Sequence, residues 1–486
     1  MILAVRRDTM ARNVAILIGT IAGLLIVVWL WLRPSPWAEA ILVPAQYPAF
    51  RQDAQPQLVK VSQLPALNGY ASPKPVVAAD RFGNVAVVSH GVVNTPLGID
   101  ILLWLSGDRG DSWGQPENLT KSGKAGEINF DPWLETDGDC RYYLVYAQRR
   151  QGNLISLRSK DFAKSWSRSL QIPWKFGDRP VLGTSPNGKT LVVAAAMTER
   201  SANVPTEPLD GNDPKRQEKL RAAVVSYAGI FVSSDHGSTW GKWTSPFGHE
   251  NAIPFAVVVD NANRVAASWV IEGDGSRSAV SVSQDGGQTW TNTTLVKSLQ
   301  PDRPHPFNGE RFPVIALDGS DGLHVAYVTA GATKVLIQSS ADWKTWKDAA
   351  VLSNDSIDEV RMAAIDACGP MVHVTWMERI SNNWQAYYRG SRDSGETWSP
   401  PLCLSKSIEF SDASIANGFQ IYGDDDQSSV RDDGLGRVHA LWSVHGGRIA
   451  HAIVDWSSKT KVGEQNDAAE LWPTRKMKST SAATTR

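Results

Sequence analysis

The stretch SSDHGSTW, from Ser233 to Trp240, is the part of the sequence that decides the fold. Its pattern, Ser-x-Asp-x-Gly-x-Ser/Thr-Trp, returns as SGDRGDSW at 106–113, SQDGGQTW at 283–290 and SRDSGETW at 391–398. Two altered copies are SKDFAKSW at 159–166 and SSADWKTW at 339–346. Six copies of so specific an octet predict a chain built from repeated structural units.

Each octet has the composition of a tight hairpin turn. The Asp carboxylate can accept hydrogen bonds from its own loop, and the Gly supplies a backbone conformation with positive φ. The Trp then packs on the sheet, where burial of its ring contributes about 2–3 kcal/mol. We therefore interpret the Asp and Trp residues of the octets as structural, not catalytic: Asp108, Trp113, Asp161, Trp166, Asp235, Trp240, Asp285, Trp290, Asp342, Trp346, Asp393 and Trp398.

A second pattern, an apolar run, a turn and a β-rich run, precedes each octet and occurs seven times. Each full unit reads as strand, hairpin, strand, loop, strand, octet, strand, which is the pattern of a four-stranded blade. The sequence thus predicts an all-β fold, a β-propeller of seven blades over residues 70–460, with six blades as the alternative. The last unit lacks its outer strand, which Gln57–Leu67 could supply to close the ring.

The N-terminal segment predicts on which side of a membrane the propeller lies. Residues 14–32 carry no charge, and a helix of this length spans the hydrocarbon core of a bilayer. Three arginines within residues 1–13 predict a cytoplasmic N-terminus and an extracytoplasmic propeller. We expect a single-pass transmembrane signal anchor, and the alternative is a signal peptide cleaved at Ala38-Glu39-Ala40. Residues 33–69 would then be a linker, and residues 461–486 a disordered tail.

The composition limits the classes of partner and cofactor that we expect for this chain. There are 49 Lys plus Arg against 50 Asp plus Glu, which gives no electrostatic reason to expect nucleic acid. The three cysteines, Cys140, Cys368 and Cys403, have no zinc-type spacing. We therefore predict no metal and no cofactor. A disulfide between Cys368 and Cys403 is the alternative to three free thiols.

The octets SSDHGSTW, SQDGGQTW and SRDSGETW resemble the Asp-box (BNR) repeat of the sialidase-like β-propeller superfamily. The resemblance covers about residues 70–456 and is specific for the fold. The same repeat occurs in sialidases, other glycoside hydrolases, sorting receptors and assembly factors, so it does not choose an activity. The Phe-Arg-Ile-Pro signature of sialidases is absent near the first blade.

The topology of a blade indicates where a ligand would bind. The octet turns share one face with the first hairpins, whereas the longest connections, residues 199–223, 297–310 and 404–427, fall on the other face. Insertions that gather on one face usually carry function. We therefore expect a glycan or protein ligand on the face opposite the octets.

Arginines stand near the start of several innermost strands on this face. They are Arg179, Arg311 and Arg361, with Arg431 deeper in the last blade. A guanidinium cluster suits a carboxylate or another anion. Because sialidases bind the carboxylate of their substrate with three arginines, the resemblance implies an anion site here. The alternative is that each arginine pairs locally with an adjacent acidic residue.

Carboxylates and a tyrosine complete the set of candidate site residues. Glu272 and Glu378 end second strands, Asp131 begins an innermost strand, and Tyr422 lies in the last long connection. Such carboxylates serve as general acids or ligand contacts. Sialidases use a Tyr nucleophile with a supporting Glu and a separate acid, so the resemblance makes Tyr422, Glu378 and Asp131 the catalytic candidates, and Glu272 a ligand contact.

Two functional hypotheses follow. One is a module that binds a glycan or protein ligand, and the other is an exo-sialidase-like glycoside hydrolase acting on an anionic sugar. Binding is preferred because no residue-by-residue motif supports the nucleophile or the acid.

Overall fold

The computed structural model describes residues 54–456, except 73, 95–96, 122–127, 149–152, 168–169, 173–176, 201–223, 272–276, 297–311, 330, 356–357, 382, 409–413, 417–418, 422–427 and 445–446. All of them belong to one compact unit within residues 47–486. The predicted anchor at 14–32 and the tail at 461–486 lie outside the described residues. Among those described, no helix has the length and apolar character needed to cross a membrane.

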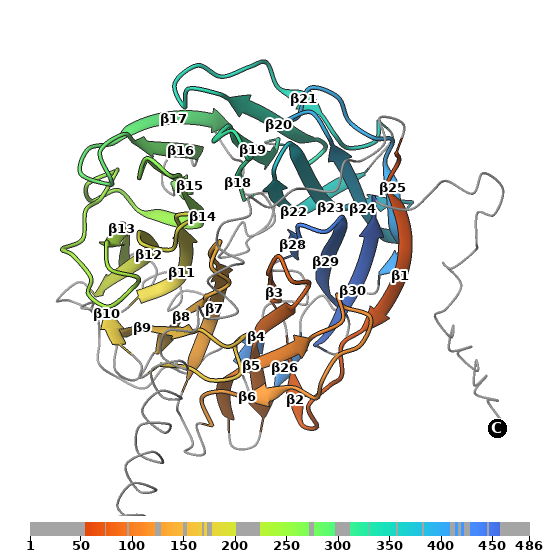
Figure 1. Cartoon of the computed structure of the whole chain (residues 1–486), viewed down its shortest axis with the longest axis horizontal. Coiled ribbons are helices and arrows are strands. Elements are labelled where there is room, and N and C mark those ends of the chain that lie inside the picture. Colours follow the sequence, from red (N-terminus) through yellow and green to blue (C-terminus); the bar gives the residue numbers. More distant parts are fainter. Residues whose placement is uncertain are drawn as a thin grey trace, which may run out of the picture. The chain divides into compact units, whose positions relative to one another are not determined.

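Seven antiparallel sheets surround a central axis, so the protein is an all-β, seven-bladed propeller, as the repeats predicted (Figure 1). The innermost strands of blades one to seven are β3 (Val76–Ala79), β7 (Asn129–Thr136), β11 (Gly177–Thr184), β14 (Ala252–Val259), β18 (Val314–Leu317), β22 (Glu359–Cys368) and β28 (Ser428–Asp432). The second strands are β4 (Val85–Asn94), β8 (Tyr142–Gln148), β12 (Leu191–Arg200), β15 (Val265–Ile271), β19 (Leu323–Val328), β23 (Met371–Ile380) and β29 (Arg437–Val444).

The third and outer strands complete the blades. The third strands are β5 (Leu97–Ser106), β9 (Asn153–Ser159), β13 (Val224–Ser233), β16 (Arg277–Ser283), β20 (Val335–Ser340), β24 (Asn383–Ser391) and β30 (Arg448–Asp455). The outer strands are β6 (Glu117–Asn118), β10 (Leu170–Ile172), β17 (Thr291–Val296), β21 (Ala350–Val351), β25 (Leu402–Ile408) and β1 (Gln57–Gln63). In addition, β2 (Tyr70–Ala71) pairs with β4, and β26 (Ser414–Ala416) pairs with β27 (Phe419–Ile421).

Blade three differs from the four-stranded expectation. Its sheet has three strands, and the only pairing described beyond β13 is a bridge between Ile230 and Thr244. Pro246 follows this bridge, and Pro cannot donate to a strand ladder. Gly248, with a φ of 62°, then turns the chain. These two residues explain why the fourth strand ends after one bridge.

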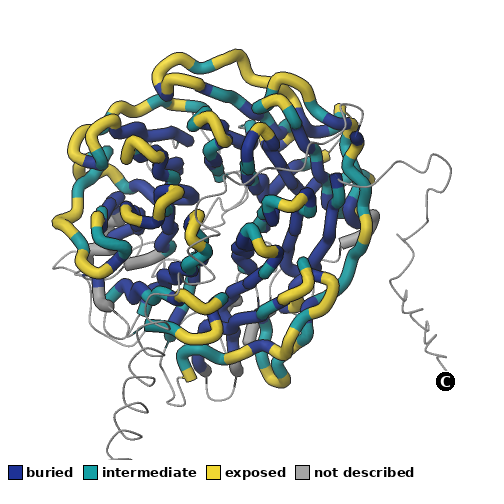
Figure 2. The backbone as a smooth tube through the Cα atoms, viewed as in Figure 1, coloured by how far each residue is buried: buried dark blue, intermediate teal, exposed yellow. Residues whose placement is uncertain are grey.

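The core lies between the blades. The second strands are the most deeply buried, because both faces of each sheet pack against a neighbouring blade (Figure 2). Trp269, Trp376 and Trp442 on β15, β23 and β29 are almost completely buried, as is Trp104 on β5. Several tryptophans outside the octets are therefore core residues, each contributing about 2–3 kcal/mol by burial.

Strand β1 closes the ring from the other end of the chain. It pairs with β30 from Gln57 opposite Asp455 to Gln63 opposite Ala450. The seventh sheet thus has the order β1-β30-β29-β28, with its outer strand taken from the segment in which the sequence placed it. This pairing covers the edge of β30 that an open sheet would expose.

Each octet forms a turn that follows a third strand. In Ser233–Trp240, the Asp235 carboxylate accepts hydrogen bonds from Ser233 Oγ at 2.8 Å, Thr239 N at 2.8 Å and Thr239 Oγ1 at 2.7 Å. Gly237 has a φ of 74°, and Trp343 holds the corresponding place in the altered copy at 339–346 with a φ of 62°. The Asp of each of the other octets accepts hydrogen bonds in the same way: Asp108, Asp161, Asp285, Asp342 and Asp393.

The octets share a face with the first hairpins of the blades. Backbone hydrogen bonds join Arg109 N to Gly83 O at 3.1 Å and His236 N to Lys189 O at 3.1 Å. The innermost strands end on this face, so they begin on the opposite one. We call that opposite side the entry face.

Candidate functional site

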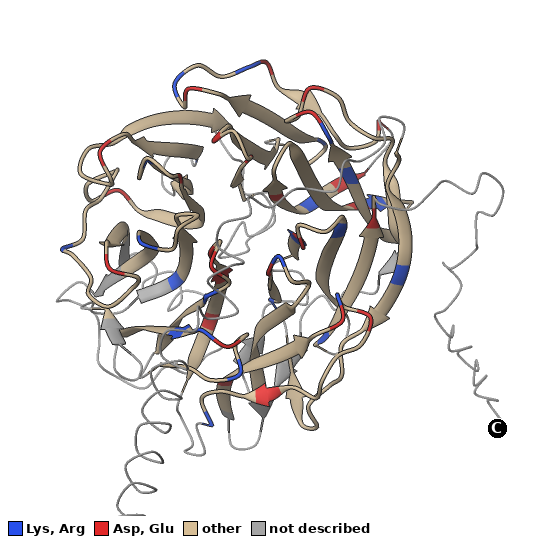
Figure 3. Cartoon of the chain, viewed as in Figure 1, with Lys and Arg blue, Asp and Glu red and all other residues tan. Residues whose placement is uncertain are grey.

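A cavity of about 500 Å³ runs along the axis of the propeller. All seven innermost strands contribute to its lining, from Asp131 and Arg179 near the start of their strands to Asp318 at the end of another. Figure 3 shows charged residues on the inner strand β7 beside this axis. We divide the cavity into two regions: the mouth, which lies at the entry face, and the channel, which lies below the mouth.

Backbone bulges turn side chains toward the mouth. The pairing of β7 with β8 shifts between Phe130 and Trp133, and the skipped segment contains Asp131, whose φ is 49°. In β11 the skipped segment contains Arg179, with a φ of 47°. A bulge at the rim of a sheet re-aims a side chain, and positive φ in a residue with a Cβ costs about 1 kcal/mol or more. Both strained residues line the cavity.

Lys74, His90 and Arg179 influence Asp131 at the mouth. Lys74 Nζ lies 3.1 Å from Asp131 Oδ1, and His90 Nδ1 lies 3.7 Å from the same oxygen. Burial alone would raise the pKa of Asp131, but Lys74, Arg179 and His90 together hold it well below its usual value. Asp131 is therefore a carboxylate at neutral pH.

Two phenylalanines form an apolar side of the mouth. The rings of Phe255 and Phe312 stack with centroids 3.6 Å apart and planes inclined by 16°. The guanidinium of Arg179 lies 5.6 Å from the ring centre of Phe312. Arg179 thus connects the charged side of the mouth with the aromatic side.

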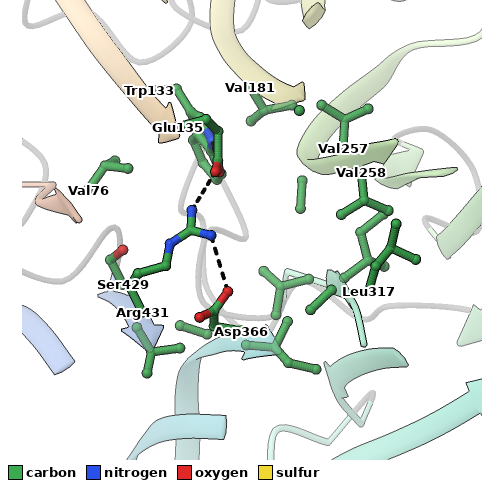
Figure 4. Close-up of a pocket in the computed structure, with 18 of the residues that line it drawn as sticks. Val76, Trp133, Glu135, Val181, Val257, Val258, Leu317, Asp366, Ser429 and Arg431 are labelled. Atoms are coloured by element: carbon green, nitrogen blue, oxygen red, sulfur yellow. Dashed lines mark hydrogen bonds and ion pairs between the residues drawn. The ribbon is translucent and has the colours of Figure 1, made fainter. Parts of the chain in front are cut away.

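An ion bridge crosses part of the channel below the mouth. Arg431 Nη2 lies 2.5 Å from Glu135 Oε2, and Arg431 Nη1 lies 3.2 Å from Asp366 Oδ1 (Figure 4). The three residues come from blades seven, two and six. Burial raises the pKa of Glu135 and of Asp366 although Arg431 lowers both. One guanidinium thus stands between two carboxyl groups, both of which bind protons more readily than usual.

Two of the predicted site residues lie away from the cavity. Arg361 Nε donates to Glu359 Oε1 at 2.8 Å, and its guanidinium lies 4.6 Å from the ring centre of Trp384. Glu378 is completely buried and accepts hydrogen bonds from Asn354 N, Asn354 Nδ2 and Trp376 Nε1 at 2.7–2.9 Å. Neither residue is among those lining the cavity. Arg361 and Glu378 therefore have the local partners expected of structural groups.

Three other predicted residues, Arg311, Glu272 and Tyr422, lie outside the described residues. Of the arginines proposed for the anion site, Arg179 and Arg431 line the cavity, and Arg431 is held by two carboxylates. The described residues thus place one predicted arginine, Arg179, at the mouth beside the predicted Asp131.

The sequence interpretation missed several residues of the cavity. At the mouth these are Lys74, Phe255 and Phe312, and in the channel Glu135 and Asp366. A usable signal was a residue followed by Pro at the start of an innermost strand, which occurs at Lys74, Asp131, Arg179, Ile253 and Phe312. All of these except Ile253 line the cavity.

The part of the chain that the structure describes contains neither a metal-binding cluster nor a disulfide bond. No group of three or more His, Cys, Asp or Glu residues there has a geometry that could hold a metal ion. Cys140, Cys368 and Cys403 form no disulfide, so the alternative of a bond between Cys368 and Cys403 is wrong.

Neither a family model nor a curated protein sequence matches this chain. Similar solved structures include Hadza microbial sialidase Hz136, at 12% identity and a TM-score of 0.43, over 79% of this chain and 65% of that one, less than two thirds of its length. A Dyadobacter fermentans protein of unknown function has 14% identity and a TM-score of 0.44, over 82% and 99%. An ulvan lyase, a polysaccharide lyase of family PL25, has 12% identity and a TM-score of 0.46, over 82% and 96%. Similarities at this level assign no activity.

Proposed function

We propose that this protein binds a glycan through an anionic sugar residue at the mouth of its central cavity. The observation that carries the proposal is that the cations of Lys74 and Arg179 both act on the Asp131 carboxylate at the mouth. Ammonium and guanidinium groups in this position favour a carboxylate or sulfate group of a ligand, which accepts charge-assisted hydrogen bonds from them.

The aromatic side of the mouth supports a sugar as the ligand. Phe255 and Phe312 are stacked on each other beside Arg179. A sugar ring has an apolar face of C–H groups and a rim of hydroxyls, so it can contact an aromatic wall and nearby charged groups together. A concave, largely apolar site with a few convergent polar groups is the usual form of a small-molecule site.

Hydrolysis is the alternative, and Asp131 is the residue that favours it. Asp131 lies at the mouth and remains ionised, so it suits the role of a base or nucleophile and not that of a proton donor. Glu378, the proposed partner of a tyrosine nucleophile, is occupied by Asn354 and Trp376. The acid of a glycosidase therefore has no candidate at the mouth among the described residues, and we favour binding.

The cellular setting is also a proposal. Residues 14–32 would anchor the chain as a single-pass membrane protein, with the N-terminus cytoplasmic and the propeller extracytoplasmic. The octets, with their repeated Asp and Gly geometry, support membership of the Asp-box (BNR) repeat proteins. The ligand would then be met outside the cytoplasm.

Calorimetry with the full-length protein tests the binding proposal. We expect D-glucuronate or N-acetylneuraminate to bind and D-glucose to bind at least tenfold more weakly, because a charge-assisted hydrogen bond contributes about 1.5–3 kcal/mol. Arg179→Gln should reduce the affinity for the acidic sugar about 10- to 100-fold. Arg277→Gln, which removes a surface guanidinium paired with Glu250, is the matched control. Equal affinity for charged and neutral sugars, or turnover of a glycoside abolished by Asp131→Asn, would contradict the proposal.

A further inference from the structure

Below the mouth, the channel has an apolar side whose residues are not fully buried. Val258 on β14, Val314 and Leu317 on β18, and Ile365 on β22 line the cavity and keep partial exposure. Figure 4 shows Val257, Val258 and Leu317 together on the side of the cavity opposite Arg431. When an apolar group displaces water from such an apolar surface, the free energy of the system falls.

The polar side of the channel does not offer a second anion site. Arg431 already contacts Glu135 and Asp366, and its group carries one positive charge against two carboxyl groups. An anionic group placed there would meet excess negative charge or a protonated carboxyl, whereas Lys74 and Arg179 at the mouth attract it. Charge therefore orients a ligand with its anionic part at the mouth.

We propose that the ligand is an anionic sugar carrying an apolar aglycone, alkyl or aryl, and that the channel receives this apolar group. The proposal rests on the function proposed above and adds the class of ligand. The lining is continuous from Arg179 and Phe312 at the mouth to Leu317 and Ile365 in the channel. A cavity of about 500 Å³ falls in the range of pockets that enclose a small organic ligand.

Three probes separate the two parts of the site: methyl β-D-glucuronide, phenyl β-D-glucuronide and phenyl β-D-glucoside. Calorimetry with the full-length protein should give an affinity at least tenfold higher for the phenyl than for the methyl glucuronide, as expected for burial of an aromatic ring. Phenyl glucoside should bind more weakly than phenyl glucuronide, because it lacks the charge. A gain below twofold from the phenyl group overturns the inference.

Variants of the apolar side locate the effect. Leu317→Gln and the nearly isosteric Val258→Thr should reduce the gain from the phenyl group and leave the affinity for methyl glucuronide within about twofold. Val351→Gln, at an exposed position of the outer strand β21, is the matched control and should keep the gain. If the phenyl gain persists in both channel variants, the aglycone lies elsewhere and the inference is wrong.

Failure of the inference and failure of the proposed function give different results. If methyl glucuronide binds but the phenyl group adds nothing, the inference fails and anion binding stands. If methyl glucuronide does not bind and phenyl glucoside binds as tightly as phenyl glucuronide, the proposed function fails. In that case, the change in affinity for phenyl glucoside caused by Leu317→Gln still tests whether the channel binds the phenyl group.

Discussion

At the scale of single residues, each octet aspartate accepts hydrogen bonds from backbone N–H and hydroxyl groups of its own turn. Without the carboxylate, these groups would have to bond to water. Asp235 accepts hydrogen bonds from Ser233 and Thr239, and these contacts lower its pKa to about 2, with the Thr239 hydroxyl as the largest cause. The same contacts recur at each octet although the neighbouring residues differ. The turn therefore depends on one side chain in each of the six blades that carry an octet.

The first prediction concerns this side chain. Asp235→Ala removes three hydrogen bonds, and we expect a loss of about 1–2 kcal/mol in the free energy of unfolding, as for other carboxylates that cap backbone groups. Urea denaturation at pH 7 measures it. The exposed Asp348→Ala is the control and should change stability by less than about 0.5 kcal/mol. Equal effects of both substitutions would show that the hydrogen bonds contribute little.

The second prediction concerns Arg431. Arg431→Met leaves Glu135 and Asp366 buried without their cation, and we expect a loss of about 3–5 kcal/mol at pH 7. The deficit should shrink as the pH falls, because both carboxyl groups have raised pKa values and become neutral first. Urea denaturation at several pH values measures it, with Arg277→Met as a surface control expected to cost about 0–1 kcal/mol. A deficit that does not depend on pH would contradict this account.

At the scale of elements, β1 illustrates how one strand stabilises the ring. Leu58 and Val61 of β1 pack against the cluster between blades six and seven. The register shifts between Leu58 and Lys60, which leaves Val59 as a bulge residue that is 50% exposed. The strand thus contains both paired and unpaired positions, and these should differ in their tolerance of proline.

The third prediction uses this difference. Ser62→Pro replaces a residue opposite His451, two positions before Leu64, whose N–H donates to Ile449 O. Because hydrogen-bonded pairs alternate along an antiparallel ladder, Pro at 62 removes a donor to β30 and should destabilise the propeller by about 3 kcal/mol. Val59→Pro is the matched control, because bulges accept Pro, and it should cost less than 1 kcal/mol. Thermal unfolding followed by circular dichroism compares them. Similar melting temperatures for both variants would show that β1 contributes little to closure.

At the scale of the whole molecule, a buried histidine pair lies where the ring closes. His439 Nδ1 and His451 Nε2 of blade seven lie 3.1 Å apart, and Trp113 of blade one donates to His451 Nδ1 at 3.3 Å. Gly110 of the first octet packs directly on both rings, where a Cβ would lie 2.8 Å from His451. Burial lowers the pKa of His439 to about 3 and that of His451 well below its usual value, and nearby cationic groups add to both shifts.

The fourth prediction is a loss of stability in mild acid. Below a pH of about 6.5 these histidines bind protons in the unfolded chain but stay neutral in the propeller, so unfolding becomes more favourable as the pH falls toward 3. Each histidine contributes about 1.4 kcal/mol per pH unit in this window. His439→Gln with His451→Gln should flatten the dependence of stability on pH, measured by urea denaturation. His249→Gln, at an exposed position, should leave it unchanged, and an equally steep dependence in the double variant would contradict the prediction.

The fold was largely predictable from the sequence, whereas the site was predictable only in part. Seven repeats gave seven blades, and a missing outer strand indicated that an N-terminal segment completes the last blade. Of the site residues that the structure describes, Asp131 and Arg179 lie at the mouth, but Glu378 and Arg361 have other partners. A position at the end of a strand is not sufficient to place a side chain in the cavity, because a bulge or a neighbouring loop decides where that side chain points.

The sequence by itself determined the octet-bearing blades, because an octet turn depends on hydrogen bonds between residues two to four positions apart and is therefore specified within its own repeat. Only the tertiary structure decided which polar groups meet in the cavity. Glu135 and Arg431 are 296 positions apart in the chain and become partners only when blade seven closes next to blade one. Such a contact depends on the geometry of the whole ring, which no local pattern specifies.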